Sequence, residues 1–281
     1  MLKESKHYQK IQRAIDYIEA NLDANISLRD VSNVAFSSLS YFHRVFFYLT
    51  GYTLKEYIRR RRLAKAAFEL VNSNKKVIDI ALDSFYESPE SFARAFKKQY
   101  KLSPRQFRNE NQEHPVFKSL NIFDPNKNYE RPEMLIEQSY VVFKETKITG
   151  FKTRTSIENS VDICDFSDEI LLSGKLSNYF SPESPIYGIY TDMSDSSNFD
   201  YTIAGAANLQ TKENTEFVSH IIPTSQYAKF INTDLSKIKE AWRYIYGFWI
   251  PENDQLRTKG FDFEIYKEDS VEIYIPMQAN H

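Results

Sequence analysis

The chain has 281 residues, 42% of them hydrophobic, and this length predicts two domains of about 100 to 150 residues each. Its apolar runs are shorter than the roughly 20 residues of a membrane helix, and its polar start lacks a secretory signal, so we expect a soluble cytoplasmic protein with no membrane partner. One cysteine, Cys164, and five histidines without metal-site spacing predict no disulfide, metal or other cofactor.

The net charge of −2 divides unevenly along the chain. Residues 1–111 contain 20 Lys and Arg against 12 Asp and Glu, a balance of +8, whereas the remainder contains 16 against 26, a balance of −10. A basic half next to an acidic half indicates that the first binds a polyanion and the second binds something else.

The first 110 residues predict an all-helical domain. Apolar side chains recur at helical spacing within residues 11–22, 39–49 and 54–70. Ser27 followed by Asp30 resembles a capping box, and Ser88 before Pro89 places a cap residue ahead of a proline at the first helical position.

A helix-turn-helix pattern occurs twice in this region. In the first copy SLRDVSNVA is the predicted scaffold helix, FSS the turn and LSYFHRVFFYLTG the recognition helix. In the second copy these parts are KVIDIALDSF, YES and PESFARAFKKQY. Such a unit places the exposed face of its second helix in the major groove of DNA.

From about residue 135 the pattern becomes β-rich, with runs of Val, Ile, Tyr and Phe. Helical candidates at about 160–179 and 235–249 interrupt these strands, so the order strand, helix, strand, strand occurs twice. We expect an α+β domain, a duplicated β-α-β-β antiparallel sheet with two helices on one face. The predicted domains are residues 1–110 and 134–281, and the Asn-, Glu- and Pro-rich residues 111–133 are the predicted linker.

Several motifs in the first 110 residues resemble those of the AraC/XylS family of transcription activators. They are S-x-x-Y-F-H-R-x-F, G-Y-x-x-x-x-Y-I-x-x-R-R-L-x-x-A, I-x-x-I-A, F-x-S-P-E-S-F-x-R-x-F-K-K and S-P-x-x-F-R. The resemblance implies a non-enzymatic regulator that binds promoter DNA and acts with RNA polymerase. It also implies seven helices, with a long one at about 54–72 between two recognition helices. Ser84 and Lys101 stand where this family usually has glycine, which puts the local turn geometry in question.

The resemblance carries groove-facing roles to Ser40, His43, Arg44, Pro89, Glu90 and Arg94. The two arginines can each donate twice to guanine O6 and N7, and the glutamate can accept from cytosine N4. The proline can instead simply start its helix.

Other polar residues near these helices are predicted to contact phosphate: Arg59, Arg62, Ser91, Lys97, Lys98 and Arg105. The run at positions 59–62 contains four consecutive arginines, which one helical turn spreads over all sides. We therefore expect only one or two of them to reach the backbone of DNA.

The second half resembles the GyrI-like effector-binding domain in W-x-x-I-Y-G-F-W-I-P, K-G-F-D-F-E-I-Y and V-E-I-Y-I-P-M. The resemblance implies a cleft for aromatic, often cationic, small molecules, with a carboxylate in the last-but-one strand at its floor. By strand alternation Phe261, Phe263 and Ile265 point one way, and Asp262, Glu264 and Tyr266 the other. We expect the first set to pack under the helices, so that Glu264 and Tyr266 face the cleft.

A carboxylate among aromatic rings suits a flat organic cation, because charge pairing and cation–π attraction then act together. The predicted ligand-binding residues besides Glu264 and Tyr266 are Trp242, Tyr140, Phe151, Tyr190, Tyr201 and Trp249. The favoured function is a ligand-responsive activator of multidrug or stress defence genes. Two recognition helices in one chain favour a monomer on DNA. The alternatives are that the second domain is a hydrolase-like enzyme, or a protein-interaction module with a filled cleft.

Overall fold

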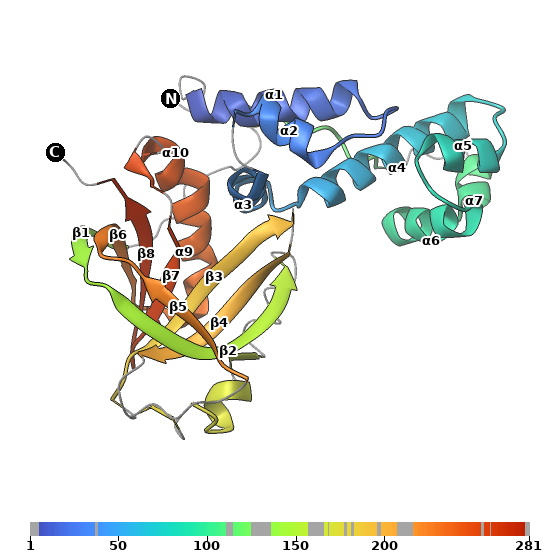
Figure 1. Ribbon diagram of the computed structural model, residues 1–281. Helices are drawn as coiled ribbons and strands as arrows, with labels where there is room; N and C mark the ends of the chain where they lie inside the picture. The colour runs from blue at the N-terminus through green and yellow to red at the C-terminus, as the bar shows by residue number, and fades with distance from the viewer. Residues whose placement is uncertain are drawn as a thin grey trace. The chain divides into compact units, whose positions relative to one another are not determined.

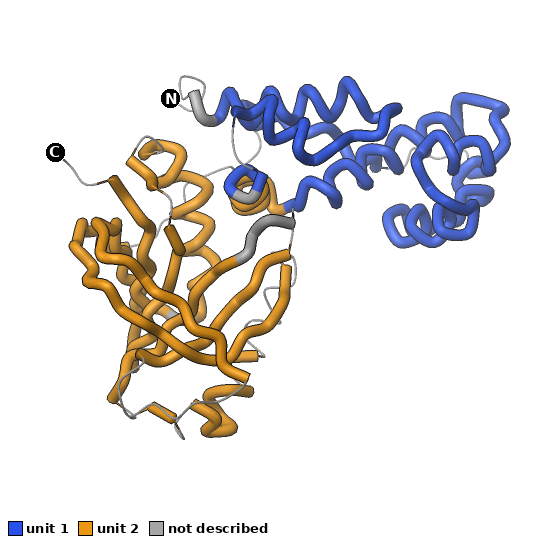
Figure 2. The backbone as a smooth tube through the Cα atoms, viewed as in Figure 1, with its two compact units in different colours: residues 1–42, 52–128 blue, residues 43–51, 129–281 orange. Residues whose placement is uncertain are grey.

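A computed structural model gives the fold of the chain in two compact units (Figure 2). Unit 1 comprises Met1–Phe42 and Tyr52–Asn128, and unit 2 comprises His43–Gly51 and Tyr129–His281. The structure describes residues 6–36, 39–110, 115–124, 136–156, 166–167, 169–176, 179–180, 183–195, 198–206, 216–253, 256–258 and 260–278. Within these residues no helix combines the length and apolarity needed to cross a bilayer.

The residues described from the first part of the chain form helices only, which confirms the predicted all-helical domain (Figure 1). The helices are α1 (Lys6–Ala20), α2 (Leu28–Val34), α3 (Leu39–Thr50), α4 (Leu54–Asn72), α5 (Val77–Asp83), α6 (Pro89–Tyr100) and α7 (Pro104–Asn109). Helix α3 contains the division between the units, since its residues from His43 onward belong to unit 2.

Local capping fixes where several of these helices begin. The Ser88 side chain accepts a hydrogen bond from the Ser91 backbone N–H and begins α6, with Pro89 at the first helical position as predicted. Ser103 begins α7 in the same way. The predicted cap at Ser27 is not formed by its side chain, so the expected capping box there is wrong.

The turns of the two helix-turn-helix units contain phenylalanines in the left-handed region, Phe36 at φ 51° and Phe85 at φ 62°. Ser84, the position where a change in turn geometry was expected, has an ordinary φ of −89°. Lys101 does adopt the left-handed conformation, at φ 65°, and ends α6. The left-handed residue of this turn is therefore Phe85, one residue after Ser84.

The core of the second helix-turn-helix unit is aromatic. Phe96 is fully buried, and its ring contacts those of Phe92, Tyr100 and Phe107 at centroid distances of 5.5, 4.7 and 5.2 Å. Leu63 and other small or branched side chains of α4 complete this cluster. The second copy of the pattern thus has a dry core that holds α6 against α4, α5 and α7.

Residues 115–124, which we expected to be part of a linker, pack into unit 1. The backbone N–H of Leu120 donates to the Tyr57 hydroxyl at 3.1 Å, and that of Ile122 donates to the Gln12 side chain at 2.8 Å. Leu120 and Ile122 are themselves buried. Their apolar side chains explain the difference, because burying them is more favourable than leaving them in a mobile connection.

Unit 2 contains an eight-stranded antiparallel sheet within the described residues. Its strands are β1 (Glu137–Phe143), β2 (Thr146–Ser156), β3 (Ile186–Asp195), β4 (Asn198–Ala206), β5 (Val218–Ile222), β6 (Ser225–Asn232), β7 (Phe263–Tyr266) and β8 (Val271–Met277). They lie in the order β1-β6-β8-β7-β3-β4-β2-β5, in which β6-β8-β7 and β2-β4-β3 mirror each other about the centre. This is the order that a duplicated β-α-β-β unit would give, and the duplication itself stays a prediction.

The sheet is curled, so that its concave side holds a core of its own (Figure 1). The ring of Phe143 on β1 lies 5.0 Å from that of Phe263 on β7, although two strands separate β1 from β7 and a flat sheet would place them roughly 14 Å apart. Tyr227 and Tyr274 complete the aromatic cluster between them.

Helical segments cover the opposite side of the sheet. They are η2 (Leu235–Lys237), α9 (Ile238–Tyr244), a π-helical turn η3 (Ile245–Trp249) and α10 (Ile250–Asn253), with further helical residues at 169–172. Glu264 and Tyr266 lie on this covered side, and Phe263 and Ile265 lie on the concave side. The predicted alternation is correct, but the expectation that the apolar set packs under the helices is wrong because the curl gives that set a separate core.

Phe96→Ala tests the aromatic core of the second helix-turn-helix unit. Removing this fully buried ring should lower the free energy of unfolding by about 3 to 5 kcal/mol, because a cavity remains. Urea unfolding of the full chain followed by circular dichroism at 222 nm measures the loss. Phe68→Ala is the matched control, since Phe68 is 67% exposed and its truncation should change stability by less than about 0.5 kcal/mol. Equal effects of the two substitutions would contradict this core.

Candidate functional site

The Glu264 carboxylate on β7 is fully buried and lies in a cage of aromatic hydrogen-bond donors. Its Oε1 accepts from the Trp242 indole Nε1 at 2.6 Å and from the Tyr190 hydroxyl at 2.9 Å. Its Oε2 accepts from the Tyr266 hydroxyl at 2.7 Å and from the Tyr201 hydroxyl at 3.5 Å. Four neutral donors thus satisfy both oxygens without a cationic side chain.

Strand register brings this cage together. Gly188 on β3 pairs with Glu264 on β7, so the space above the glycine is open to the carboxylate. A Cβ atom on Gly188 would lie 2.3 Å from the Tyr201 hydroxyl and 2.8 Å from Glu264 Oε2. The missing side chain is therefore what allows the carboxylate and the tyrosine to meet at this point of the sheet.

Burial raises the pKa of Glu264 above its ordinary value, and the four donors oppose that rise only in part. The neighbouring Tyr190 and Tyr266 hydroxyls have pKa values well above the ordinary one, because of burial first and the Glu264 charge second. The hydroxyls therefore remain protonated donors, and the carboxylate can change its charge at a milder pH than an exposed glutamate.

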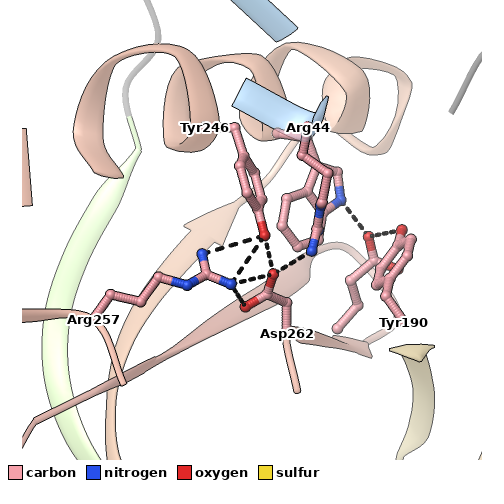
Figure 3. Close-up of polar contacts among 7 residues, drawn as sticks. Arg44, Tyr190, Tyr246, Arg257 and Asp262 are labelled. Atoms are coloured by element: carbon pink, nitrogen blue, oxygen red, sulfur yellow. Dashed lines mark hydrogen bonds and ion pairs between the residues drawn. The ribbon is translucent and has the colours of Figure 1, made fainter. Parts of the chain in front are cut away.

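A second buried carboxylate, Asp262, lies two residues before Glu264 and has a different environment (Figure 3). Arg257 Nη2 donates to Oδ1 at 3.0 Å and to Oδ2 at 3.1 Å, and Arg44 Nη1 donates to Oδ2 at 2.6 Å. The Tyr246 hydroxyl also donates to Oδ2. Although burial alone would raise it, the pKa of Asp262 is held below its ordinary value by the Arg257 and Arg44 guanidinium groups.

The guanidinium of Arg44 is itself surrounded by aromatic rings. Its Cζ lies 4.0 Å from the centroid of the Tyr246 ring, and 5.6 Å from the centroids of both Trp242 and Tyr190. Only 7% of the side chain is exposed. The Arg44 guanidinium is itself a flat cation, and it already occupies the space between Asp262 and these aromatic rings.

This position differs from the expected role of Arg44 in reading bases. Arg44 and its neighbour His43 are both buried, as part of the segment of α3 that belongs to unit 2. Neither side chain is presented to solvent in this structure. For Arg44, unit 2 supplies aromatic and acidic partners that a helix-turn-helix pattern alone does not reveal. The side chain of Ser40 lies outside the described residues.

The polar residues of the second recognition helix lie where the pattern predicts. Glu90 and Arg94 on α6 are exposed, as are the predicted phosphate contacts Lys97, Lys98 and Arg105. Pro89 is half-buried at the start of the helix, and the Ser91 side chain donates to the Ser88 carbonyl within the cap.

The four consecutive arginines of α4 do point to different sides, as predicted. Arg62 donates to the backbone carbonyls of Leu22 and Ala24, and Arg61 forms an ion pair with Glu19. These two arginines hold α4 to the end of α1, so the expected phosphate role of Arg62 competes with contacts inside unit 1. Arg59, the other predicted phosphate contact on α4, has 41% of its side chain exposed.

Five of the eight predicted ligand-binding residues form the Glu264 cage: Glu264, Tyr266, Trp242, Tyr190 and Tyr201. The other three lie elsewhere. Phe151 packs with Phe217, the Trp249 ring packs against Phe230, and Tyr140 on β1 is 45% exposed. These three do not contact Glu264 through any of the hydrogen bonds of the cage, and their role in ligand binding stays a prediction.

Sequence reasoning missed four members of the site, namely Asp262, Tyr246, Arg257 and Arg44 in its buried role. The first two carried a signal, since strand alternation places Asp262 on the same side as Glu264, and Tyr246 lies one helical turn after Trp242. Nothing in the sequence indicated Arg257. The described residues contain no group of three potential metal ligands.

The sequence matches two families. Residues 31–110 match a helix-turn-helix domain family, and residues 141–277 match the family described as integron-associated effector binding protein. These two matches cover the halves of the chain that contain the duplicated helix-turn-helix pattern and the Glu264 cage.

Several named relatives are similar to this chain, two of them over about 100 residues and one over most of its length. Regulatory protein SoxS of Salmonella typhimurium is 36% identical over 102 residues, which are 36% of this chain and 95% of that protein. The HTH-type transcriptional regulator YbfP of Bacillus subtilis is 43% identical over 103 residues, but the match spans only 35% of its length. Right origin-binding protein of Escherichia coli is 27% identical over 267 residues, 91% of this chain and 89% of that one. SoxS and YbfP are regulators by name, in agreement with the prediction of a non-enzymatic protein.

Solved structures give weaker likenesses. An integron cassette protein from Vibrio cholerae aligns with 52% of this chain and 100% of its own, at a TM-score of 0.41 and 20% identity. An AraC-type regulator from Chromobacterium violaceum aligns with 36% of this chain and 89% of its own, at a TM-score of 0.35 and 24% identity.

Gly188→Ala tests whether the open space beside Glu264 is required. The added methyl group should displace Tyr201 and Glu264 and lower the stability of unit 2 by about 1 to 3 kcal/mol, the usual range for overpacking. Unfolding followed by the fluorescence of Trp242 and Trp249 measures the change. Gly247→Ala is the control, because its Cβ would meet nothing closer than 3.7 Å. If both substitutions leave the transition unchanged, the described packing around Gly188 is incorrect.

Proposed function

Because the chain belongs to the AraC-type helix-turn-helix transcription regulators and carries a GyrI-like effector-binding domain, we propose that a small aromatic cation bound near Glu264 controls its action at a promoter. DNA binding and transcription regulation are properties of the family. The proposal concerns the ligand, its site and the direction of control.

The observation that carries the proposal is the buried carboxylate within an aromatic cage. A charge of this kind costs several kcal/mol to bury unless it is paired, and neutral donors compensate only part of that cost. A cation next to Glu264 would pair with its charge, and the faces of Tyr190 and Trp242 would add cation–π attraction of about 0.5 to 2 kcal/mol. Burial raises the pKa of Glu264, and the four neutral donors only partly oppose that rise.

We propose that the second recognition helix reads bases through Glu90 and Arg94, since both are exposed on α6. Lys97, Lys98 and Arg105 are the proposed phosphate contacts on the same unit. Activation of transcription through RNA polymerase, a cytoplasmic location and binding of DNA as a monomer complete the proposal. Two recognition helices in a single chain support the monomer, because they supply the two contacts that other regulators obtain by dimerising.

Arg94→Ala tests the reading role of α6. The change should weaken the full chain on its specific site by about 1 to 3 kcal/mol and relax the preference at one base pair, because a bidentate contact to guanine is lost. Lys97→Ala, the control, should weaken binding to specific and random DNA equally. Binding isotherms on both DNAs at several salt concentrations measure this. Equal losses on both DNAs for Arg94→Ala would place that residue on the phosphate backbone instead.

Glu264→Gln tests the ligand site with tetraphenylphosphonium, a rigid aromatic cation, as the probe. The substitution keeps the size of the side chain and removes its charge, so affinity should fall more than about tenfold, which corresponds to 1.4 kcal/mol. Triphenylphosphine oxide, a neutral analogue, should bind the parent and the variant alike. Calorimetric titration of the full chain measures both ligands. Unchanged affinity for the cation would overturn the assignment of the site.

The same titration has a pH dependence with a defined sign. Burial raises the Glu264 pKa, so as the pH falls the carboxylate becomes neutral at a pH above the value of about 4.3 for an exposed glutamate, and cation affinity should fall there. The Glu264→Gln variant should show no such dependence. Glu272→Gln provides the matched control, because Glu272 is a buried carboxylate of the same unit that pairs with Lys229 and Lys267 and has a lowered pKa. It should behave like the parent.

A further inference from the structure

We propose that Asp262, together with Tyr246, Trp242 and Tyr190, forms a binding site for guanidinium and amidinium groups, and that Arg44 is its built-in occupant, which an organic cation with N–H donors displaces. The inference extends the proposed function, since it adds a second carboxylate with its own ligand chemistry to the Glu264 cage. It rests on the proposed function only in linking the displacement to DNA.

The geometry around Arg44 is that of a bound ligand. One N–H group donates to Asp262 Oδ2 at 2.6 Å, while the flat guanidinium lies 4.0 Å from the Tyr246 centroid and within 5.6 Å of the Trp242 and Tyr190 centroids. Charge pairing, hydrogen bonding and cation–π contact are the three interactions by which proteins recognise such cations. Amidines and guanidines offer the same planar array of donors as arginine.

The exchange of one cation for another is possible because Asp262 has a second partner. Arg257 Nη2 contacts both oxygens of the carboxylate, at 3.0 and 3.1 Å. When Arg44 leaves, Asp262 therefore remains paired, and the large cost of a buried unpaired charge does not arise. Arg44 contacts one oxygen of Asp262, whereas Arg257 contacts both, so the carboxylate keeps its two-oxygen contact when Arg44 is exchanged.

The position of Arg44 in the sequence connects this site to DNA. Arg44 belongs to α3, the predicted recognition helix of the first helix-turn-helix unit, yet its segment is part of unit 2. One guanidinium cannot contact Asp262 and a guanine at the same time. A ligand that takes the Asp262 site therefore favours the state in which Arg44 is available to DNA, and DNA in turn favours ligand binding.

Benzamidine, a small aromatic amidinium, is the probe for the exchange. In the full chain Arg44→Ala should bind benzamidine at least about tenfold more tightly than the parent, because no occupant has to be displaced. The double variant with Asp262→Asn should lose this gain. Arg154→Ala is the matched control, since it removes another arginine of unit 2 that pairs with a carboxylate, Asp200, away from the site. It should bind benzamidine as the parent does.

Neutral benzamide separates recognition of charge from the filling of a cavity. Benzamide has nearly the same shape, so its affinity should not rise in Arg44→Ala. An equal rise for benzamide and benzamidine, or no rise for benzamidine, would overturn the inference. Either result leaves the Glu264 assignment standing if tetraphenylphosphonium still depends on Glu264, because that probe has no N–H donors for Asp262.

Hydrogen exchange of the unmodified protein gives an independent test that does not depend on a variant's folding. Saturating benzamidine should speed amide exchange in residues 43–51, because the segment loses its anchor at Asp262. A ligand that merely binds and stabilises the folded chain would slow exchange in the same segment. Slower or unchanged exchange there, at a concentration at which benzamidine is bound, would contradict displacement of Arg44.

Discussion

The burial of two carboxylates, Glu264 on the short strand β7 and Asp262 just before it, is the constraint on which the rest of unit 2 depends. Glu264 and Asp262 lie two residues apart beside the same helical segments, and both are removed from water. An isolated buried carboxylate costs several kcal/mol, so each must be compensated by its surroundings. The side chains around these two carboxylates therefore supply hydrogen-bond donors as well as apolar volume.

The two carboxylates are compensated by different means, and their chemistry differs as a result. Four hydroxyl and indole donors surround Glu264, and its pKa is raised because burial prevails over neutral hydrogen bonds. Two guanidinium groups pair with Asp262, and its pKa is lowered because their charges prevail over burial. Glu264 could therefore still pair with a positive charge, whereas Asp262 already pairs with Arg257 and Arg44.

The sequence predicted those features that local pattern determines. Helical periodicity located the helices of the first half, and the alternation of β7 placed Glu264 and Tyr266 on one side of the sheet. Pro89 stands at the start of its helix as expected. Tyr190, Tyr201 and Trp242, three of the predicted ligand-binding residues, do contact Glu264, although they come from two other strands and a helix.

What the sequence did not predict depends on contacts between distant segments. Arg44 looks like a base-reading residue from its motif, and only the pairing with Asp262, 218 residues later, shows its buried role. The curl of the sheet gave Phe263 and Ile265 a core of their own, which a flat two-layer arrangement does not provide. Residues 115–124 lie between Asn-, Glu- and Pro-rich runs that predicted a linker, but Leu120 and Ile122 are buried and their backbone N–H groups hydrogen-bond to unit 1.

The most direct measurement of the central claim is a double-mutant cycle between Arg44→Ala and Asp262→Asn in the full chain. The free energy of unfolding of the parent, both single variants and the double variant would be obtained from denaturant transitions followed by tryptophan fluorescence. Because the two side chains share a buried ion pair, we expect a coupling energy of about 1 to 3 kcal/mol, within the range for residues in direct contact. Effects that add to within about 0.5 kcal/mol would show that Arg44 and Asp262 do not interact and would contradict the account.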